Sequence, residues 1–196
     1  MAPLTRSETQ RRNREHVLEV ARRLFLRDGY AATSLAAVAE EAGISTGVVY
    51  SNFSGKSGLA LAVLREIEAE QIERLTSGIA AAGNASDKLA VFDAWAEDAL
   101  TSGWPRLELD FALDHRDDPE LVLAEGRRHE SLVRLIVAEI GPLLPESLRT
   151  PAVEHAVADA VMNLAIGSAV RRIIDPKATV SELLGVLRAL VSGSLT

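Results

Sequence analysis

Apolar residues recur three or four positions apart along almost the whole of this chain, and no stretch shows the sustained two-residue alternation of a half-buried strand. This pattern predicts an all-α fold of about nine helices. The chain has 196 residues, of which 47% are hydrophobic. A chain of this length and composition can bury a sizeable core, so disorder is excluded.

Composition excludes several kinds of site. The chain contains no cysteine, which rules out a disulfide framework, a thiolate nucleophile and a cysteine-ligated metal centre. No nucleophile-elbow or phosphate-loop motif occurs, and we predict no catalytic residue, no metal site and no cofactor. No run without Asp, Glu, Lys or Arg exceeds 14 residues, and the run between residues 75 and 87 contains Gly, Asn and Ser. We therefore expect a cytoplasmic protein without a membrane span.

Helix start signals are dense in the first part of the chain. Ser7 and Gln10 have the spacing of a capping box, which predicts the start of a long first helix. Thr33 is predicted to cap a second, short helix. Ser45 is predicted to cap a third helix over residues 46–52, with its inner face in the core.

The rest of the chain is predicted to be helical as well. A fourth helix is expected over residues 56–75, followed by a loose linker at residues 78–84. The pattern predicts further helices over residues 87–100, 105–115, 119–140, 151–174 and 179–191. We expect two domains, residues 1–65 and residues 66–196, with their boundary inside the fourth helix.

Charge is distributed unevenly between these two domains. The formal net charge of the chain is −7, yet residues 1–65 contain nine basic and six acidic side chains. The remaining residues therefore carry a balance of −10. A mildly basic head on an acidic body is compatible with DNA binding by the head, although a solvated basic helix face gives the same count.

The two short helices and the turn between them, residues 42–45, predict a helix-turn-helix, whose second helix fits the major groove of DNA. By shape alone, the same corner could serve only for packing. Residues 21–59 read ARRLFLRDGYAATSLAAVAEEAGISTGVVYSNFSGKSGL and resemble the DNA-binding head of the TetR family of bacterial transcriptional regulators. The resemblance implies a C-terminal body that binds a small molecule and dimerises, and repression that this molecule relieves.

The resemblance also implies which residues contact DNA. Thr33, Tyr50 and Lys56 stand at phosphate-contacting positions of the family, where a hydroxyl or an ammonium near a helix N-terminus suits a phosphate oxygen. The third helix is expected to face the bases without an Arg or Asn in its first turn, so direct base reading should be modest. The predicted contact residues are Thr33, Ser45, Thr46, Gly47, Val48, Tyr50, Ser51 and Lys56.

Arginines at the start of the chain are a second candidate for DNA contact. Arg6, Arg11, Arg12 or Arg14 are expected to add contacts to the DNA backbone or the minor groove, and a solvated helix face is the alternative. Gly58, in the first turn of the fourth helix, should weaken that turn by about 1 kcal/mol relative to Ala.

Large apolar side chains gather near the start of the second domain, where four of the eight aromatic residues lie between residues 92 and 111. Core filling explains each of them singly. Helical bundles also build ligand cavities, and the resemblance implies a pocket among these helices. We predict a largely apolar, planar or bulky effector, oriented by polar groups such as Asp110, His115 or Asn163 and bound by Phe92, Trp95, Trp104, Leu107, Phe111 and Met162.

Small residues recur at four-residue spacing in the penultimate helix, at Ala152, Ala156 and Ala160, and Leu187 lies on an apolar face of the last helix. Small residues let helices approach closely, so we predict a homodimer formed by the last two helices. Packing within one chain is the alternative.

These observations predict a homodimeric repressor that binds double-stranded, pseudo-palindromic operator DNA and is released by a small-molecule effector. Two other classes remain open. A DNA-bound interaction protein without a small-molecule inducer would have a filled body without a pocket. A helical enzyme with a vestigial head would turn over the compound that it binds.

Overall fold

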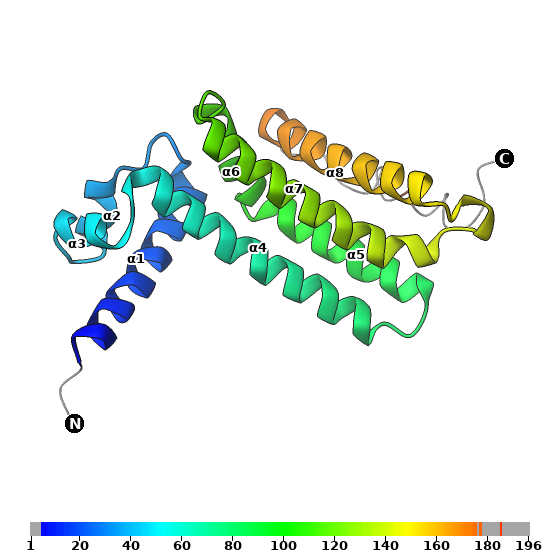
Figure 1. Cartoon of the computed structure of the whole chain (residues 1–196), viewed down its shortest axis with the longest axis horizontal. Helices are drawn as coiled ribbons and strands as arrows, with labels where there is room; N and C mark the ends of the chain where they lie inside the picture. The colour runs from blue at the N-terminus through cyan, green and yellow to red at the C-terminus, as the bar shows by residue number, and fades with distance from the viewer. Residues whose placement is uncertain (1–4, 176, 178–184, 186–196) are drawn as a thin grey trace. The chain divides into compact units, whose positions relative to one another are not determined.

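The computed structural model describes residues 5–175 together with residues 177 and 185, and these residues form α-helices and short 3₁₀ turns without a strand (Figure 1). The all-α prediction is confirmed. The ninth predicted helix, residues 179–191, lies outside the described residues except for residue 185. The helices are α1 (Arg6–Asp28), α2 (Leu35–Glu41), α3 (Thr46–Asn52), α4 (Gly55–Ala81), α5 (Ala85–Thr101), α6 (Trp104–Asp114), α7 (Pro119–Ile140) and α8 (Pro151–Ile174), with the 3₁₀ turns η1 (Gly141–Leu143) and η2 (Glu146–Leu148).

The predicted caps of α1 and α2 are wrong by one or two residues. Thr5 caps α1, because its hydroxyl accepts from the Glu8 N–H at 3.3 Å while the Glu8 carboxylate accepts from the Thr5 N–H at 2.7 Å. A carboxylate makes the stronger capping box, which explains why Thr5 and Glu8 prevail over Ser7 and Gln10.

The start of α2 shows the same kind of shift. Ser34 caps this helix by accepting from the Ala37 N–H at 3.1 Å. The Thr33 side chain is only 4% exposed, and its hydroxyl donates to the Gly29 carbonyl at 2.9 Å. Because the Thr33 methyl group is buried with the core, the next hydroxyl along the chain is left to cap the helix.

Helix α4 is longer than predicted, so the expected linker is wrong over residues 78–81. Gly78 lies inside the helix, at a point where α5 passes very close to it. A Cβ atom at this position would come 2.7 Å from Val91 Cγ1. Glycine here serves a close helix approach and does not end the helix.

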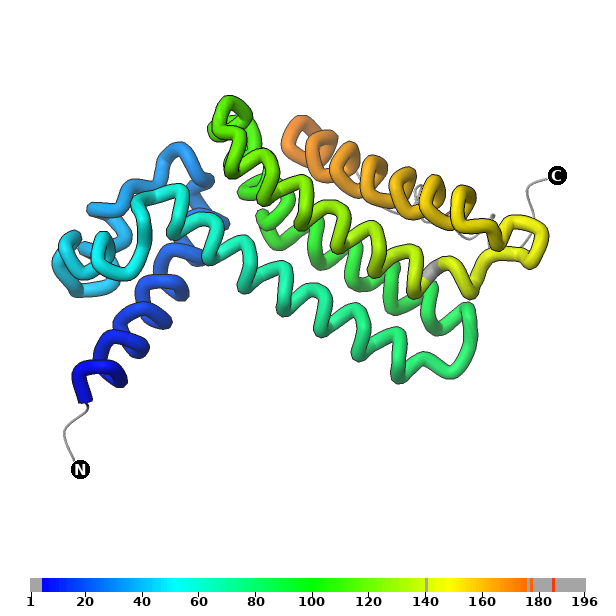
Figure 2. The backbone as a smooth tube through the Cα atoms, in the orientation of Figure 1, coloured from blue at the N-terminus to red at the C-terminus, as the bar shows by residue number. Residues whose placement is uncertain are grey.

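The chain forms two compact units. The first unit comprises Met1–Glu70 and Arg106–Leu113, and the second comprises Gln71–Pro105 and Asp114–Thr196. Helix α4 contributes residues to both units, as Figure 2 lets the reader follow along the backbone. Residues 106–113 of α6 pack with the first unit, although the sequence assigns them to the second domain.

The first unit has an apolar core. Its fully buried side chains come from the first four helices and include Val17, Phe25, Val38, Val49 and Leu59. Buried side chains of α6 complete this core. Phe111 of α6 has no exposed surface and meets the Tyr30 ring edge-on, with 5.5 Å between the ring centroids.

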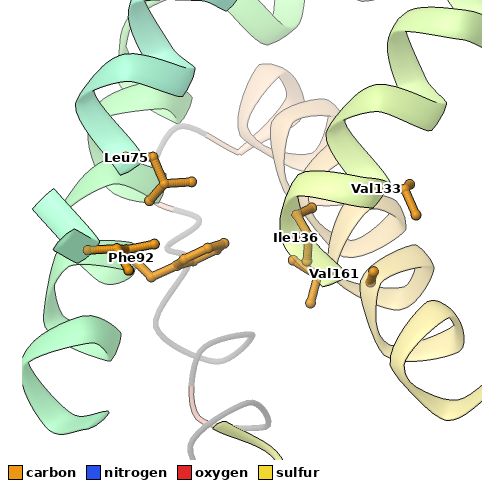
Figure 3. Packing of buried hydrophobic residues seen from close by; sticks show 7 residues of the cluster. Leu75, Phe92, Val133, Ile136 and Val161 are labelled. Carbon is orange, nitrogen blue, oxygen red and sulfur yellow. The ribbon is translucent and has the colours of Figure 1, made fainter. Parts of the chain in front are cut away.

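The second unit packs α5, α7 and α8 around an apolar layer, with the last turns of α4. Leu75 and Phe92 face Val133, Ile136 and Val161 across this layer (Figure 3). The packing of this layer holds the four helices against one another.

Candidate nucleic-acid interface

Helix α3 presents one face to solvent and buries the other. Val49 is fully buried and anchors the inner face, while the Tyr50 side chain is 61% exposed. A Cβ atom built on Gly47 would meet only Ser45 Oγ, at 3.8 Å, so the surface there is open. Val48 is half-buried, and the exposed residues of the predicted contact set on this helix and its cap are Ser45, Thr46, Gly47, Tyr50 and Ser51.

Hydrogen bonds within α3 occupy part of this face. The Ser51 hydroxyl donates to the Val48 carbonyl at 2.8 Å, and Asn52 Nδ2 donates to the same oxygen at 2.7 Å. The N-cap residue Ser45 makes no capping hydrogen bond with its side chain. Ser45 is exposed at the amino end of α3, where the first backbone N–H groups lack partners within the helix.

Lys56 lies in the first turn of α4 and is held against the loop between α1 and α2. Its ammonium donates to the Ala31 carbonyl at 3.2 Å and lies 4.2 Å from the centroid of the Tyr30 ring. These contacts fix a positive charge beside the positive end of the α4 dipole. In the same turn, a Cβ atom on Gly58 would overlap the Ser54 hydroxyl, so the glycine leaves room for that side chain.

The four arginines of α1 that are expected to contact DNA have different surroundings. Arg6 and Arg12 are exposed. Arg11 lies 3.7 Å from the Glu15 carboxylate. Arg14 donates to the Asn52 carbonyl at the end of α3.

The six residues predicted to bind an effector do not form one cluster. Phe92 and Trp95 pack together in the second unit, with ring centroids 5.5 Å apart, and Met162 packs against the same core. Leu107 and Phe111 are buried in the first unit. They occupy one face of α6, four residues apart, and that face belongs to the core around Tyr30.

The polar residues expected to orient an effector are also dispersed. Asp110 lies in the first unit, 3.7 Å from the Arg106 guanidinium. Asn163 is exposed on α8, and His115 is half-buried after α6.

Sequence reasoning missed a set of buried polar atoms in the second unit. Within the described part of the chain, Gln71 Oε1, Trp95 Nε1, Trp104 Nε1 and Glu125 Oε1 are buried without a hydrogen-bond partner. Gln71 lies between Ile67 and Leu75 at four-residue spacing, in an otherwise apolar stripe. An amide in such a stripe is a signal that the sequence does carry.

No group of three or more His, Asp or Glu side chains among residues 5–175 could hold a metal ion. None of the helices that the structure describes is long and apolar enough to cross a membrane.

The N-terminal part of the chain is similar to known transcriptional regulators. A family model described as bacterial regulatory proteins, tetR family, matches residues 17–63. The HTH-type transcriptional regulator AcrR of Shigella flexneri is 44% identical over 59 residues, which are 30% of this chain and 27% of that protein. The HTH-type transcriptional repressor AcnR of Corynebacterium efficiens is 28% identical over 121 residues, 62% of this chain and 60% of its own. The chain thus spans 27% and 60% of the length of these relatives.

Solved structures match over nearly the whole chain. A TetR-family transcriptional regulator from Pectobacterium atrosepticum is 26% identical, with 98% of this chain and 96% of that chain covered and a TM-score of 0.65. A transcriptional regulator from Rhodococcus shares the fold at 20% identity, with 91% and 94% covered and a TM-score of 0.71.

Proposed function

Because this chain belongs to the TetR family of bacterial regulatory proteins, we propose that it is a transcriptional repressor that a small-molecule effector releases from double-stranded operator DNA. The observation that carries this proposal is the exposed outer face of α3 on a fully buried anchor, Val49. A rigid helix with an open outer face suits insertion into a major groove. The relatives are transcriptional regulators, and we propose that this protein likewise acts by binding and not as an enzyme.

On DNA, α3 lies in the major groove, and its N-terminal residues meet the base edges. The open surface at Gly47 supports close approach of the backbone, and Thr46 and Val48 suit contact with thymine methyl groups. Tyr50 and Lys56 contact phosphates on either side of the groove. The burial of Thr33 removes its hydroxyl from this set, and the exposed cap Ser34 takes the phosphate contact at the start of α2.

The repressor is a homodimer, and we assign α8 to its interface. Ala152, Ala156 and Ala160 are exposed along one side of α8, and Leu164 of this helix is 46% exposed. Exposed apolar and small side chains in a row support burial against a second copy of the same helix. The other predicted element of the interface, residues 179–191 with Leu187, lies outside the described residues except for residue 185.

The effector binds the second unit, next to Phe92, Trp95 and Met162. Its body is largely apolar, and it carries polar groups that reach the buried atoms Gln71 Oε1 and Trp95 Nε1. A buried polar atom without a partner costs about 1–3 kcal/mol, and a ligand that supplies the partner recovers this cost. Leu107 and Phe111, which belong to the core of the first unit, are left out of this site.

The proposal is tested by selecting bound DNA from a random pool, with and without candidate small molecules. The expected result is an inverted repeat whose half-sites are spaced by whole turns of DNA, together with its release by a compound of the stated chemistry. Failure to enrich any sequence would refute DNA recognition. Enrichment that no compound reverses would favour the other candidate, a DNA-bound interaction protein without an inducer.

A further inference from the structure

A contact across 38 residues of sequence joins α1 to the carboxyl end of α3. Arg14 Nη1 donates a hydrogen bond to the backbone carbonyl of Asn52, the last residue of α3, at 3.1 Å. The guanidinium carbon of Arg14 also lies 4.4 Å from the centroid of the Phe53 ring. One side chain therefore engages both the last residue of α3 and the residue that caps it.

The end of α3 needs such a partner. The last four carbonyls of any helix lack a bonding N–H within the helix, and a seven-residue helix is too short to be stable by itself. A cation at the carboxyl end satisfies a carbonyl and opposes the negative end of the helix dipole. Phe53, which is 6% exposed, anchors the same end of α3 in the core, and the Arg14 guanidinium lies over its ring.

The amino end of α3 is held differently. The cap residue Ser45 makes no capping bond with its side chain, and Thr46 and Gly47 are exposed. Val49 holds the middle of α3, and Phe53 and the bond from Arg14 hold its carboxyl end. Loss of that bond leaves the apolar anchors but frees the carboxyl end to shift.

We propose that Arg14 is a positioning residue for sequence recognition, which acts by fixing the pose of α3 and not by contacting DNA. This inference rests on the proposed function. Hydrogen bonds to base edges require donor–acceptor distances of about 2.7–3.2 Å, so a small shift of α3 breaks them. Phosphate contacts, which supply most non-specific affinity, depend far less on that pose.

The test compares Arg14→Ala with Arg27→Ala, an exposed arginine in the last turn of the same helix that pairs with the neighbouring Asp28, on operator and on unrelated DNA over a range of salt. We expect Arg14→Ala to lower operator affinity about tenfold while affinity for unrelated DNA and the salt slope stay the same. Arg14→Lys, which keeps the charge without the planar group, should recover only part of this loss. Arg27→Ala should leave the ratio of the two affinities unchanged.

An equal loss on both DNAs, with a salt slope shallower by about 1 per half-site, would make Arg14 a phosphate contact and overturn the proposal. An unchanged affinity ratio would overturn it too.

Amide hydrogen exchange without DNA separates this inference from the proposed function. Arg14→Ala should lower protection in residues 46–52 and leave the fully buried core of α1 and α4 protected. Unchanged protection in α3 would show that Arg14 does not hold this helix, even if the protein binds an operator. A loss of protection confined to α3 would show that Arg14 does hold it, even if no operator is found. If Arg14→Ala does not fold, Arg14→Lys carries both measurements.

Discussion

Val49 and Tyr50 are neighbours in α3, yet one is fully buried and the other is 61% exposed. Gly47 lies on the exposed side of α3 with Tyr50, and the surface around it is open. At the scale of single residues, substitutions on the outer face should change binding and leave folding intact.

Gly47→Leu tests this separation. The added side chain enters open space and replaces the poorest non-proline helix former, so the melting temperature should stay the same or rise slightly. On DNA, the same side chain keeps α3 out of the groove, and specific binding should be lost. The matched control is Gly126→Leu in α7, where a Cβ atom also meets nothing within 4 Å. A footprint of Gly47→Leu on the wild-type operator would show that α3 is oriented differently.

Lys56→Ala tests a phosphate contact. Removing the ammonium should weaken binding to all DNA sequences about equally and make the plot of log K against log salt shallower by about 1 per half-site. Loss of the contacts to Ala31 and Tyr30 should also lower the melting temperature slightly. Lys88→Ala, in the second unit, is the control for charge alone. A salt slope equal to that of wild type would remove Lys56 from the interface.

At the scale of helices, the sequence predicts best where a cap and a proline coincide. The predicted bounds of α7 and α8 agree with the structure because Asp118 and Thr150 cap them and a proline occupies the first position of each. The ends of α1 and α4 are less predictable. Two adjacent capping boxes compete at α1, and a tertiary contact with Val91 decides the role of Gly78.

The candidate sites show the same limit. The exposed face of α3 follows from helical spacing around Val49, so it could be predicted. The packing of Leu107 and Phe111 could not be predicted from the sequence, because only the folded chain shows that this face of α6 belongs to the first unit. Thr33 and Ser34 are both able to cap α2, and burial decides between them.

The capping box of α1 predicts a pH dependence. Hydrogen bonds from the Thr5 hydroxyl and N–H hold the pKa of Glu8 below its ordinary value of 4.5. Because the folded-state pKa is lowered, this stabilisation is present above the ordinary pKa and is lost as pH falls through the folded-state value. The protection of amides in the first turn of α1, relative to intrinsic exchange at the same pH, should therefore fall in acid below pH 4.5.

Two variants identify the residue responsible for this pH dependence. Thr5→Ala should make the first turn exchange quickly at all pH values, whereas Ser7→Ala should preserve the acid transition. The reverse result would show that Ser7, and not Thr5, caps α1.

At the scale of the whole molecule, the proposed assembly and the proposed effector response both depend on the second unit. Leu164→Glu places a charge on the exposed side of α8, so it should yield monomers and reduce operator affinity far more than affinity for unrelated DNA. Ala138→Glu, at an exposed position of α7, is the control. Sedimentation of Leu164→Glu as an intact dimer would place the interface elsewhere.

An effector can release DNA only if it binds better to the arrangement that does not bind DNA. Shifting operator occupancy from nearly full to nearly empty takes roughly 5 kcal/mol of differential affinity. Helix α4 is the element expected to carry this difference, because it runs without a break from Lys56 in the first unit to Leu75 in the second.

Trp95 and Trp104 are the only tryptophans of the chain, and both lie in the second unit. A compound that releases operator DNA should therefore change tryptophan fluorescence at the concentrations that cause release. Trp95→Ala and Gln71→Leu should raise both concentrations together, because each removes a polar partner of the effector. Phe111→Leu, in the core of the first unit, should lower the melting temperature without changing the affinity for the compound. If release of DNA is unchanged in Trp95→Ala and Gln71→Leu, these side chains only fill the core, and the effector binds elsewhere.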